Sequence, residues 1–263
     1  MKYIDMHSHI FPPGVAEKVI DTLENYYHSH WEGTGELDDL LRNLRQARIT
    51  RSVIFSSATK PSQVVPINNF ISSLQSQYPE LLIGFGTLHP AFEDIRGETE
   101  RILSLGLRGL KFHPDFQQFC IDDPAMYPIY EAVGDALPLL FHVGDYRTEY
   151  SKPERLMNIH RRFPRLKLIA AHMGGYSEWD QAWKHLIGTD VLLDISSTIR
   201  LLPDGEARRM VEAHGADKVL FASDYPGTLQ GQAVRDVLSL GLSDAENEMI
   251  FHLNAERLLG IRL

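Results

Sequence analysis

The chain has 263 residues, 43% of them hydrophobic, and a formal net charge of −9. This length supports one complete hydrophobic core, and no Pro/Gly/Ser-rich linker divides the sequence, so we expect a single domain over residues 1–263. The acidic charge, without a clustered Lys/Arg face, argues against nucleic-acid binding as the main function, and a single cysteine, Cys120, excludes internal disulfides and cysteine-based metal clusters.

Targeting signals are not evident in the sequence. No positively charged leader with an apolar core precedes His7, and no apolar run approaches the length of a membrane span. We therefore expect a cytoplasmic protein that acts on a small molecule and has no membrane partner, and we leave homo-oligomerisation open.

Short apolar runs rich in β-branched residues recur along the chain and predict buried parallel strands. There are eight of them, and the first contains a His-x-His pair. They cover Tyr3 to His9, Ser52 to Ser56, Leu82 to Leu88, Gly109 to Phe112, Leu139 to Val143, Lys167 to His172, Val191 to Ser196 and Val219 to Ser223.

Between the strands, apolar residues recur at i, i+3, i+4 and i+7, which is the spacing of helices with one buried face. Eight alternating units of strand and helix match the length of a closed (β/α)8 TIM barrel. An open doubly wound sheet is the alternative, but no Gly-x-Gly-x-x-Gly turn follows the first strand. Residues 10–48 exceed the usual spacing and predict an elaborated first βα loop over the barrel mouth.

The first strand carries two imidazoles, His7 and His9. Side chains of a strand alternate between its two faces, so both rings lie on one face and form a bidentate nitrogen ligand. The same alternation predicts that Asp5 shares the inward face, whereas Met6 and Ser8 point outward.

Later strands end in further polar residues that the barrel brings to the same mouth. The predicted inward set comprises Lys111 and His113 near strand 4, and His142, His172, Asp194 and Asp224 on strands 5 to 8. Three imidazoles and a carboxylate around one point suit a divalent ion of the zinc, manganese, iron or cobalt group.

Six segments, in this order, resemble the amidohydrolase superfamily. More narrowly, they are similar to its amidohydrolase-related branch, which includes aminocarboxymuconate-semialdehyde decarboxylase and pyrone-dicarboxylate lactonase. The segments are IDMHSHIFP at 4–12, GLKFHP at 109–114, FHVG at 141–144, AHMGG at 171–175, SDYP at 223–226 and NAERLLG at 254–260.

This resemblance implies one metal ion, zinc in first place, bound by His7, His9, His142 and Asp224. It also implies that His172 lies beside the metal-bound water or the substrate. In some members of the superfamily a strand-4 lysine is carboxylated and bridges two ions, so a carboxylated Lys111 would add a second metal.

The chemistry of these residue types agrees with that assignment. A divalent ion lowers the pKa of bound water from 15.7 to roughly 7, Asp224 can accept the proton, and His172 can stabilise an oxyanion. Lys111, His113, Arg147 and Arg200 are candidate substrate contacts, and their charge favours a carboxylated substrate. His28 and His30 repeat the His-x-His pattern in a polar loop, where a solvated or lid segment is expected.

Three functions follow from these residues. The first is a metal-dependent hydrolase acting on a small, carboxylated lactone, ester or amide. The second is a non-oxidative, metal-dependent decarboxylase with the same fold. The third is a metal-free aldolase in which Lys111 forms a Schiff base, although that chemistry leaves the histidines unexplained.

Overall fold

The computed structural model describes residues 1–263 and contains all eight predicted strands. Six of them end earlier than their predicted apolar runs. The strands are β1 (Ile4–His9), β2 (Arg51–Phe55), β3 (Leu82–Gly84), β4 (Leu110–Phe112), β5 (Pro138–Phe141), β6 (Lys167–Ala170), β7 (Leu192–Asp194) and β8 (Val219–Leu220).

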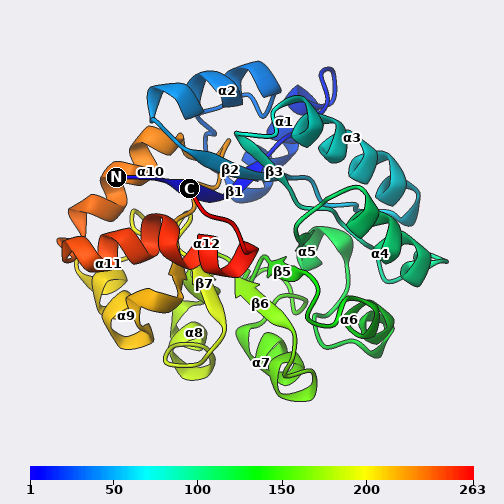
Figure 1. The fold of residues 1–263 in the computed structure, drawn as a ribbon. Helices are drawn as coiled ribbons and strands as arrows, with labels where there is room; N and C mark the ends of the chain where they lie inside the picture. The colour runs from blue at the N-terminus through cyan, green and yellow to red at the C-terminus, as the bar shows by residue number, and fades with distance from the viewer.

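Helices follow the strands and form an outer ring around them (Figure 1). This arrangement confirms the predicted alternation of strand and helix. The helices are α1 (Ala16–Tyr27), α2 (Leu37–Gln46), α3 (Val64–Gln77), α4 (Ile95–Ser104), α5 (Pro114–Gln117), α6 (Tyr127–Val133), α7 (Pro153–Arg162), α8 (Trp179–His185), α9 (Glu206–His214), α10 (Gln230–Ser239), α11 (Asp244–Glu248) and α12 (Asn254–Leu259). None of them is long and apolar enough to cross a lipid bilayer.

Parallel pairing joins the strands into two arcs, β1-β2-β3 and β4-β5-β6-β7-β8. Two single bridges connect the arcs, between Gly86 and Leu110 and between Ser8 and Tyr225. Backbone hydrogen bonds support both junctions: the Lys111 N–H donates to the Gly86 carbonyl at 2.8 Å, and the Asp224 N–H donates to the His7 carbonyl at 2.9 Å. The strands therefore surround one interior, as predicted for a TIM barrel.

Two apolar layers lie on the two sides of the strands. The inner layer holds alternate strand residues such as Met6, Leu140 and Ile169, packed against Leu259 of α12. The outer layer joins the intervening strand residues to the surrounding helices. Figure 1 shows α12 across the centre of the ring, so this helix covers one end of the barrel.

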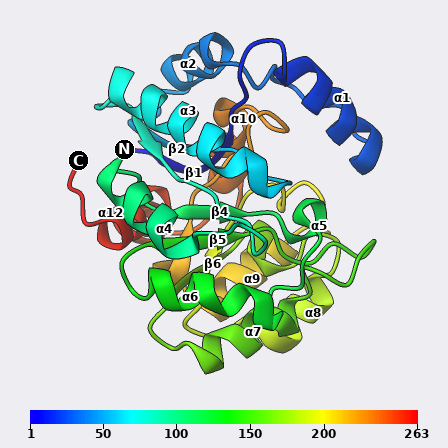
Figure 2. The same cartoon turned by 90° about the vertical axis from the view of Figure 1, so that its right-hand side faces the viewer.

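The first βα connection is long, as the sequence indicates, and it contains α1. In Figure 2, α1 extends beyond α2 at one side of the molecule, well away from α12. The cavity described below is lined by Val19, Leu23 and Tyr27 of this helix. The segment therefore forms part of the wall at the barrel mouth, opposite the end that α12 covers.

The predicted orientation of Asp5 is wrong. The pairing of β1 with β2 shifts between Asp5 and Ser8, so three steps on β1 match two steps on β2. Such a bulge reverses the alternation of side chains. Met6 consequently packs in the inner layer, whereas the Asp5 carboxylate accepts hydrogen bonds from Ser8 and from the Ser223 hydroxyl outside it. His7 and His9 both reach the barrel interior.

Candidate active site

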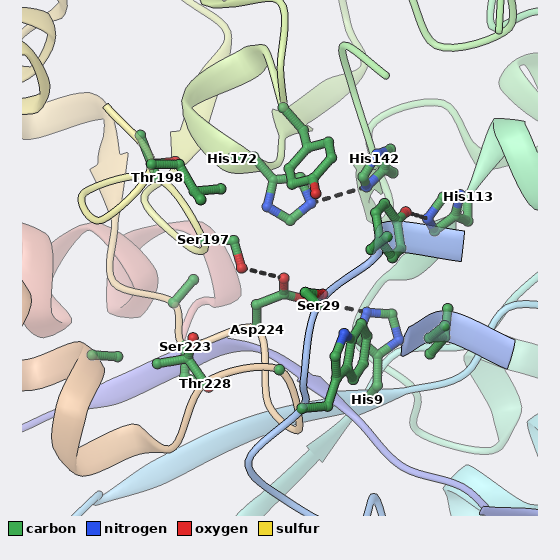
Figure 3. A pocket seen from close by; sticks show the side chains of 18 of the residues that line it. His9, Ser29, His113, His142, His172, Ser197, Thr198, Ser223, Asp224 and Thr228 are labelled. Carbon is green, nitrogen blue, oxygen red and sulfur yellow. Dashed lines mark hydrogen bonds and ion pairs between the residues drawn. The ribbon is translucent and has the colours of Figure 1, made fainter. Parts of the chain in front are cut away.

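A cavity of about 390 Å³ opens above the barrel strands, and Figure 3 shows the side chains around it. Polar residues from several strand ends meet there, including His9, His172 and Asp224. Aromatic residues form much of the remaining wall, among them Phe11, Tyr27, Trp31, Phe116 and Tyr176. The cavity therefore combines a polar base with walls suited to a flat or ring-shaped molecule.

Three electron-rich atoms converge at the base of this cavity. His7 Nε2 lies 3.1 Å from His9 Nε2 and 3.2 Å from Asp224 Oδ1, and His9 Nε2 lies 3.6 Å from the same oxygen. All three residues meet the geometric requirement for a shared metal ion. Such atoms repel one another unless a cation or a proton lies between them, so the donor set fits a divalent ion.

Asp194 determines which nitrogen of His7 faces this point. The Asp194 carboxylate lies 2.8 Å from His7 Nδ1 and also accepts hydrogen bonds from the backbone N–H groups of His172 and Ser196. A carboxylate only accepts, so His7 carries its hydrogen on Nδ1 and presents the lone pair of Nε2 to the site, where Lys111 Nζ lies 3.3 Å away. This is the usual arrangement around a metal-binding histidine.

His172 reaches the interior because the backbone leaves the strand just before it. Ile169 and Ala171 already point inward, so continued alternation would turn His172 outward. Instead, His172 adopts a left-handed conformation with φ of 59°. Its Nδ1 then lies 3.2 Å from the Ser196 carbonyl, and its Nε2 lies 2.9 Å from Nδ1 of His142 (Figure 3).

Burial and neighbouring charges shift the pKa values of the groups at the bottom of the cavity. Burial, reinforced by the positive charge of Lys111, lowers the pKa of His7 to about 3, so this ring is neutral near pH 7. Burial also lowers the pKa of Lys111 to about 8. Burial opposes ionisation of Asp224, but His7 and His9 outweigh it and hold its pKa below the usual range. Asp224 is therefore a carboxylate.

A second group of potential ligands lies beside the first and contains His142, Asp115 and Asp145. His142 Nε2 lies 3.9 Å from Asp115 Oδ2, and neither atom has a hydrogen-bond partner. Burial raises the pKa of Asp115 to about 6, against the hydrogen bonds from Thr148 and Ser151. His142 thus joins this group through Nε2, while its Nδ1 faces His172.

The four candidate substrate contacts occupy different environments. His113 lines the cavity, and its Nε2 lies 3.1 Å from the Tyr27 hydroxyl. Lys111 is fully buried outside the cavity lining, with Nζ 3.3 Å from His7 Nε2. Arg147 pairs with Asp145 at 3.1 Å. Arg200 lines the cavity but pairs with Asp236 at 2.9 Å and with Glu32 at 3.4 Å.

Two residues of the site, Ser197 and Asp115, are not predicted from the sequence. Ser197 donates a hydrogen bond to Asp224 Oδ2, and Asp115 faces His142. Asp115 follows His113 by two positions, which was the only available signal, and nothing in the local pattern marks Ser197. The exposed His28 and His30 lie outside the ligand groups; His30 pairs with Glu24 at 2.8 Å.

Comparison with known proteins gives one family match over almost the whole chain. The profile of the family described as amidohydrolase matches residues 4–261. This match confirms the resemblance that the six sequence segments indicate.

Solved structures share the fold at low sequence identity. One is 5-carboxyvanillate decarboxylase from Sphingomonas paucimobilis, with 17% identity, a TM-score of 0.72 and 99% of each chain covered. Another is the enzyme of that name from Novosphingobium aromaticivorans with bound manganese, with 15% identity, a TM-score of 0.76 and coverage of 99% and 97%. A third is a probable 2-pyrone-4,6-dicarboxylic acid hydrolase from Acinetobacter baumannii, with 17% identity, a TM-score of 0.71 and coverage of 99% and 100%.

Proposed function

This chain belongs to the amidohydrolase family, and from that premise we propose that it is a metal-dependent hydrolase of small, ring-containing molecules. The observation that carries the proposal is the convergence of His7 Nε2, His9 Nε2 and Asp224 Oδ1 at the base of the cavity. His142 Nδ1 is the proposed fourth ligand. Zinc is the first candidate ion, and manganese, which is present in one structural neighbour, is the second.

A bound divalent ion would supply Lewis acidity and an acidified water molecule at this point. The residues of the chain would then divide the remaining work. Asp224 would hold the ion through Oδ1, and Oδ2, which accepts a hydrogen bond from Ser197, would be the oxygen that takes up a proton once that hydrogen bond is released. His172 presents Nε2 to the same space, where it orients the nucleophile or stabilises a developing oxyanion once it carries a proton.

The surroundings of the site define the substrate class. Aromatic walls favour a planar or cyclic group. Arg147 and Arg200 already pair with carboxylates, so a substrate carboxylate near either one would have to displace an existing partner. We therefore propose that the first anionic group of a substrate binds near the metal centre rather than at the cavity rim.

Decarboxylation of an aromatic acid is the second candidate reaction. Arg147 and Arg200 each already pair with a carboxylate of the protein. This favours decarboxylation, because a lone substrate carboxylate would then be drawn to the metal site. The Schiff-base alternative is not favoured. Lys111 is fully buried with Nζ 3.3 Å from His7 Nε2, so its amine lies beside the proposed metal ligands, which Schiff-base chemistry leaves unexplained.

Metal analysis tests the centre itself. Purified protein should bind close to one divalent ion per chain, and His9→Ala or Asp224→Asn should weaken zinc affinity by about 100-fold or more, since each removes a direct ligand. His28→Ala is the matched control from the exposed His-x-His segment and should bind like the wild type. Calorimetric titration with zinc and with manganese gives both stoichiometry and affinity. Equal zinc affinity in the wild type and all three variants would refute the proposed metal centre.

Product analysis separates the two reactions. Panels of aromatic lactones, esters, amides and carboxylic acids are incubated with the metal-loaded protein, and released acid and carbon dioxide are measured in parallel. Hydrolysis releases acid without carbon dioxide. Carbon dioxide release that disappears in Asp224→Asn would establish the decarboxylase instead.

A further inference from the structure

His142 meets two different surroundings through its two ring nitrogens. Nδ1 lies 2.9 Å from His172 Nε2. Nε2 faces Asp115 Oδ2 at 3.9 Å, too far for a direct hydrogen bond. His142 Nε2 and Asp115 Oδ2 are both buried, and neither has a hydrogen-bond partner. Unpaired buried polar atoms are costly, so an arrangement that joins them is expected in another state of the protein.

Hydrogen positions follow from the partners of His172. The Ser196 carbonyl accepts from His172 Nδ1 at 3.2 Å, which leaves a lone pair on His172 Nε2. When no cation lies between the two nitrogens, the 2.9 Å contact requires a hydrogen on Nδ1 of His142. In that arrangement His142 is the Nδ1–H tautomer, and its Nε2 lone pair faces the unpaired oxygen of Asp115.

A second imidazole, that of His113, also lies close to Asp115 Oδ2. The Tyr27 hydroxyl lies 3.1 Å from His113 Nε2, and when it donates there, the hydrogen of His113 resides on Nδ1. That Nδ1 lies 3.7 Å from Asp115 Oδ2. The rings of His113 and His142 stack with centroids 4.1 Å apart. Asp115 Oδ2 is thus placed to receive an N–H group from each of two parallel imidazoles.

We propose that Asp115 is the positioning residue of the metal centre, and that it accepts a hydrogen bond from Nε2–H of His142 when Nδ1 binds the ion. The inference rests on the proposed function, because it requires His142 as a ligand. Metal binding removes the hydrogen from Nδ1, and Nε2 takes up one from solvent, so the ring stays neutral and the protons balance. The carboxylate then stabilises the metal-binding tautomer.

A second cation between His142, Asp115 and Asp145 is the competing interpretation of the same group. The contacts of Asp145 argue against it. Its carboxylate already accepts from the Arg147 guanidinium and from the Tyr26 hydroxyl. An ion there would have to displace or lie beside a guanidinium, which repels it.

Zinc affinity and the tautomer of His142 test the proposal together. Asp115→Asn should lower zinc affinity about 10- to 100-fold, because the amide can donate to the Nε2 lone pair and so favours the metal-free tautomer. Asp122→Asn is the control, since Asp122 pairs with Arg155 and contacts none of the proposed ligands. Nitrogen-15 NMR of labelled histidines should show His142 as Nδ1–H without zinc and as Nε2–H with zinc.

The outcomes are distinct. If wild-type protein binds no ion, the proposed function and this inference both fail. If it binds zinc but Asp115→Asn stays within twofold of the control, or His142 keeps its Nδ1–H form, only the role of Asp115 fails. Two ions in the wild type and one in Asp115→Asn would assign the group to a second metal. If Asp115→Asn does not fold, the NMR measurement on wild-type protein decides.

Discussion

At the scale of single residues, imidazole tautomers decide which nitrogen atoms can bind a metal. Asp194 holds the hydrogen of His7 on Nδ1, and the Ser196 carbonyl does the same for His172. Both rings consequently offer Nε2 to the barrel centre. The hydrogen-bond acceptor behind each histidine therefore determines which of its ring nitrogens can bind a metal.

The proposed division between ligands and His172 gives a kinetic prediction. His172→Asn should bind zinc within a few-fold of the wild type but lose about 10²- to 10³-fold in kcat, because the variant lacks the group that orients the nucleophile or stabilises the oxyanion. Metal content and kcat are measured on the same preparation. Loss of metal together with activity would show that His172 is itself a ligand, as in a two-metal centre.

At the scale of elements, the loops after β5 and β6 position His142 and His172. The two loops contact each other at Gly144 and Gly175. Gly144 has φ of 90°, and a Cβ there would lie 2.5 Å from the Cα of Gly175. Only a residue without a side chain allows both the backbone conformation and this close approach. The spacing of the two histidines therefore depends on a backbone contact between separate loops.

Gly144→Ala tests this contact. The substitution should destabilise the protein by about 2 kcal/mol or more, from the positive φ and the backbone clash together, and it should weaken zinc binding. Gly260→Ala is the control, because Gly260 also has positive φ, in the left-handed helical region, but has no atom within 4 Å of an added Cβ. It should cost only about 1 kcal/mol and leave zinc binding unchanged. Urea unfolding and zinc titration provide the comparison.

At the scale of the whole molecule, buried neutral histidines make folding sensitive to acid. Burial lowers the pKa of His7 to about 3 and of His214 to about 4, and it lowers those of His9, His113 and His142. The unfolded chain takes up protons at about pH 6.5, where these folded groups do not. Above that pH these rings are neutral in both states, and as the pH falls toward the folded values, protonation of the unfolded chain progressively lowers the free energy of unfolding.

The metal-free protein should therefore melt at progressively lower temperature between pH 7 and pH 5. Each such histidine contributes about 1.4 kcal/mol per pH unit within its window, partly offset by Asp115, whose pKa is raised. His214 lies outside the active site, so His214→Gln should reduce the slope by about one proton. Calorimetry across this range measures the slope. A flat profile would contradict the burial of neutral rings.

The sequence predicts the barrel, because apolar periodicity and strand length are local properties that eight units repeat. It also placed His7, His9, His142, His172 and Asp224 at strand ends, which a barrel necessarily brings to one mouth. Tertiary structure alone decided the β1 bulge that turns Asp5 outward and the left-handed turn that returns His172 to the interior. It likewise decided the pairing of Arg147 with Asp145 and the meeting of Asp115 with His142. The bulge and the Asp115–His142 contact join segments that are separate in the chain, whereas the Arg147–Asp145 pair forms inside one irregular loop; local periodicity carries no information about any of them.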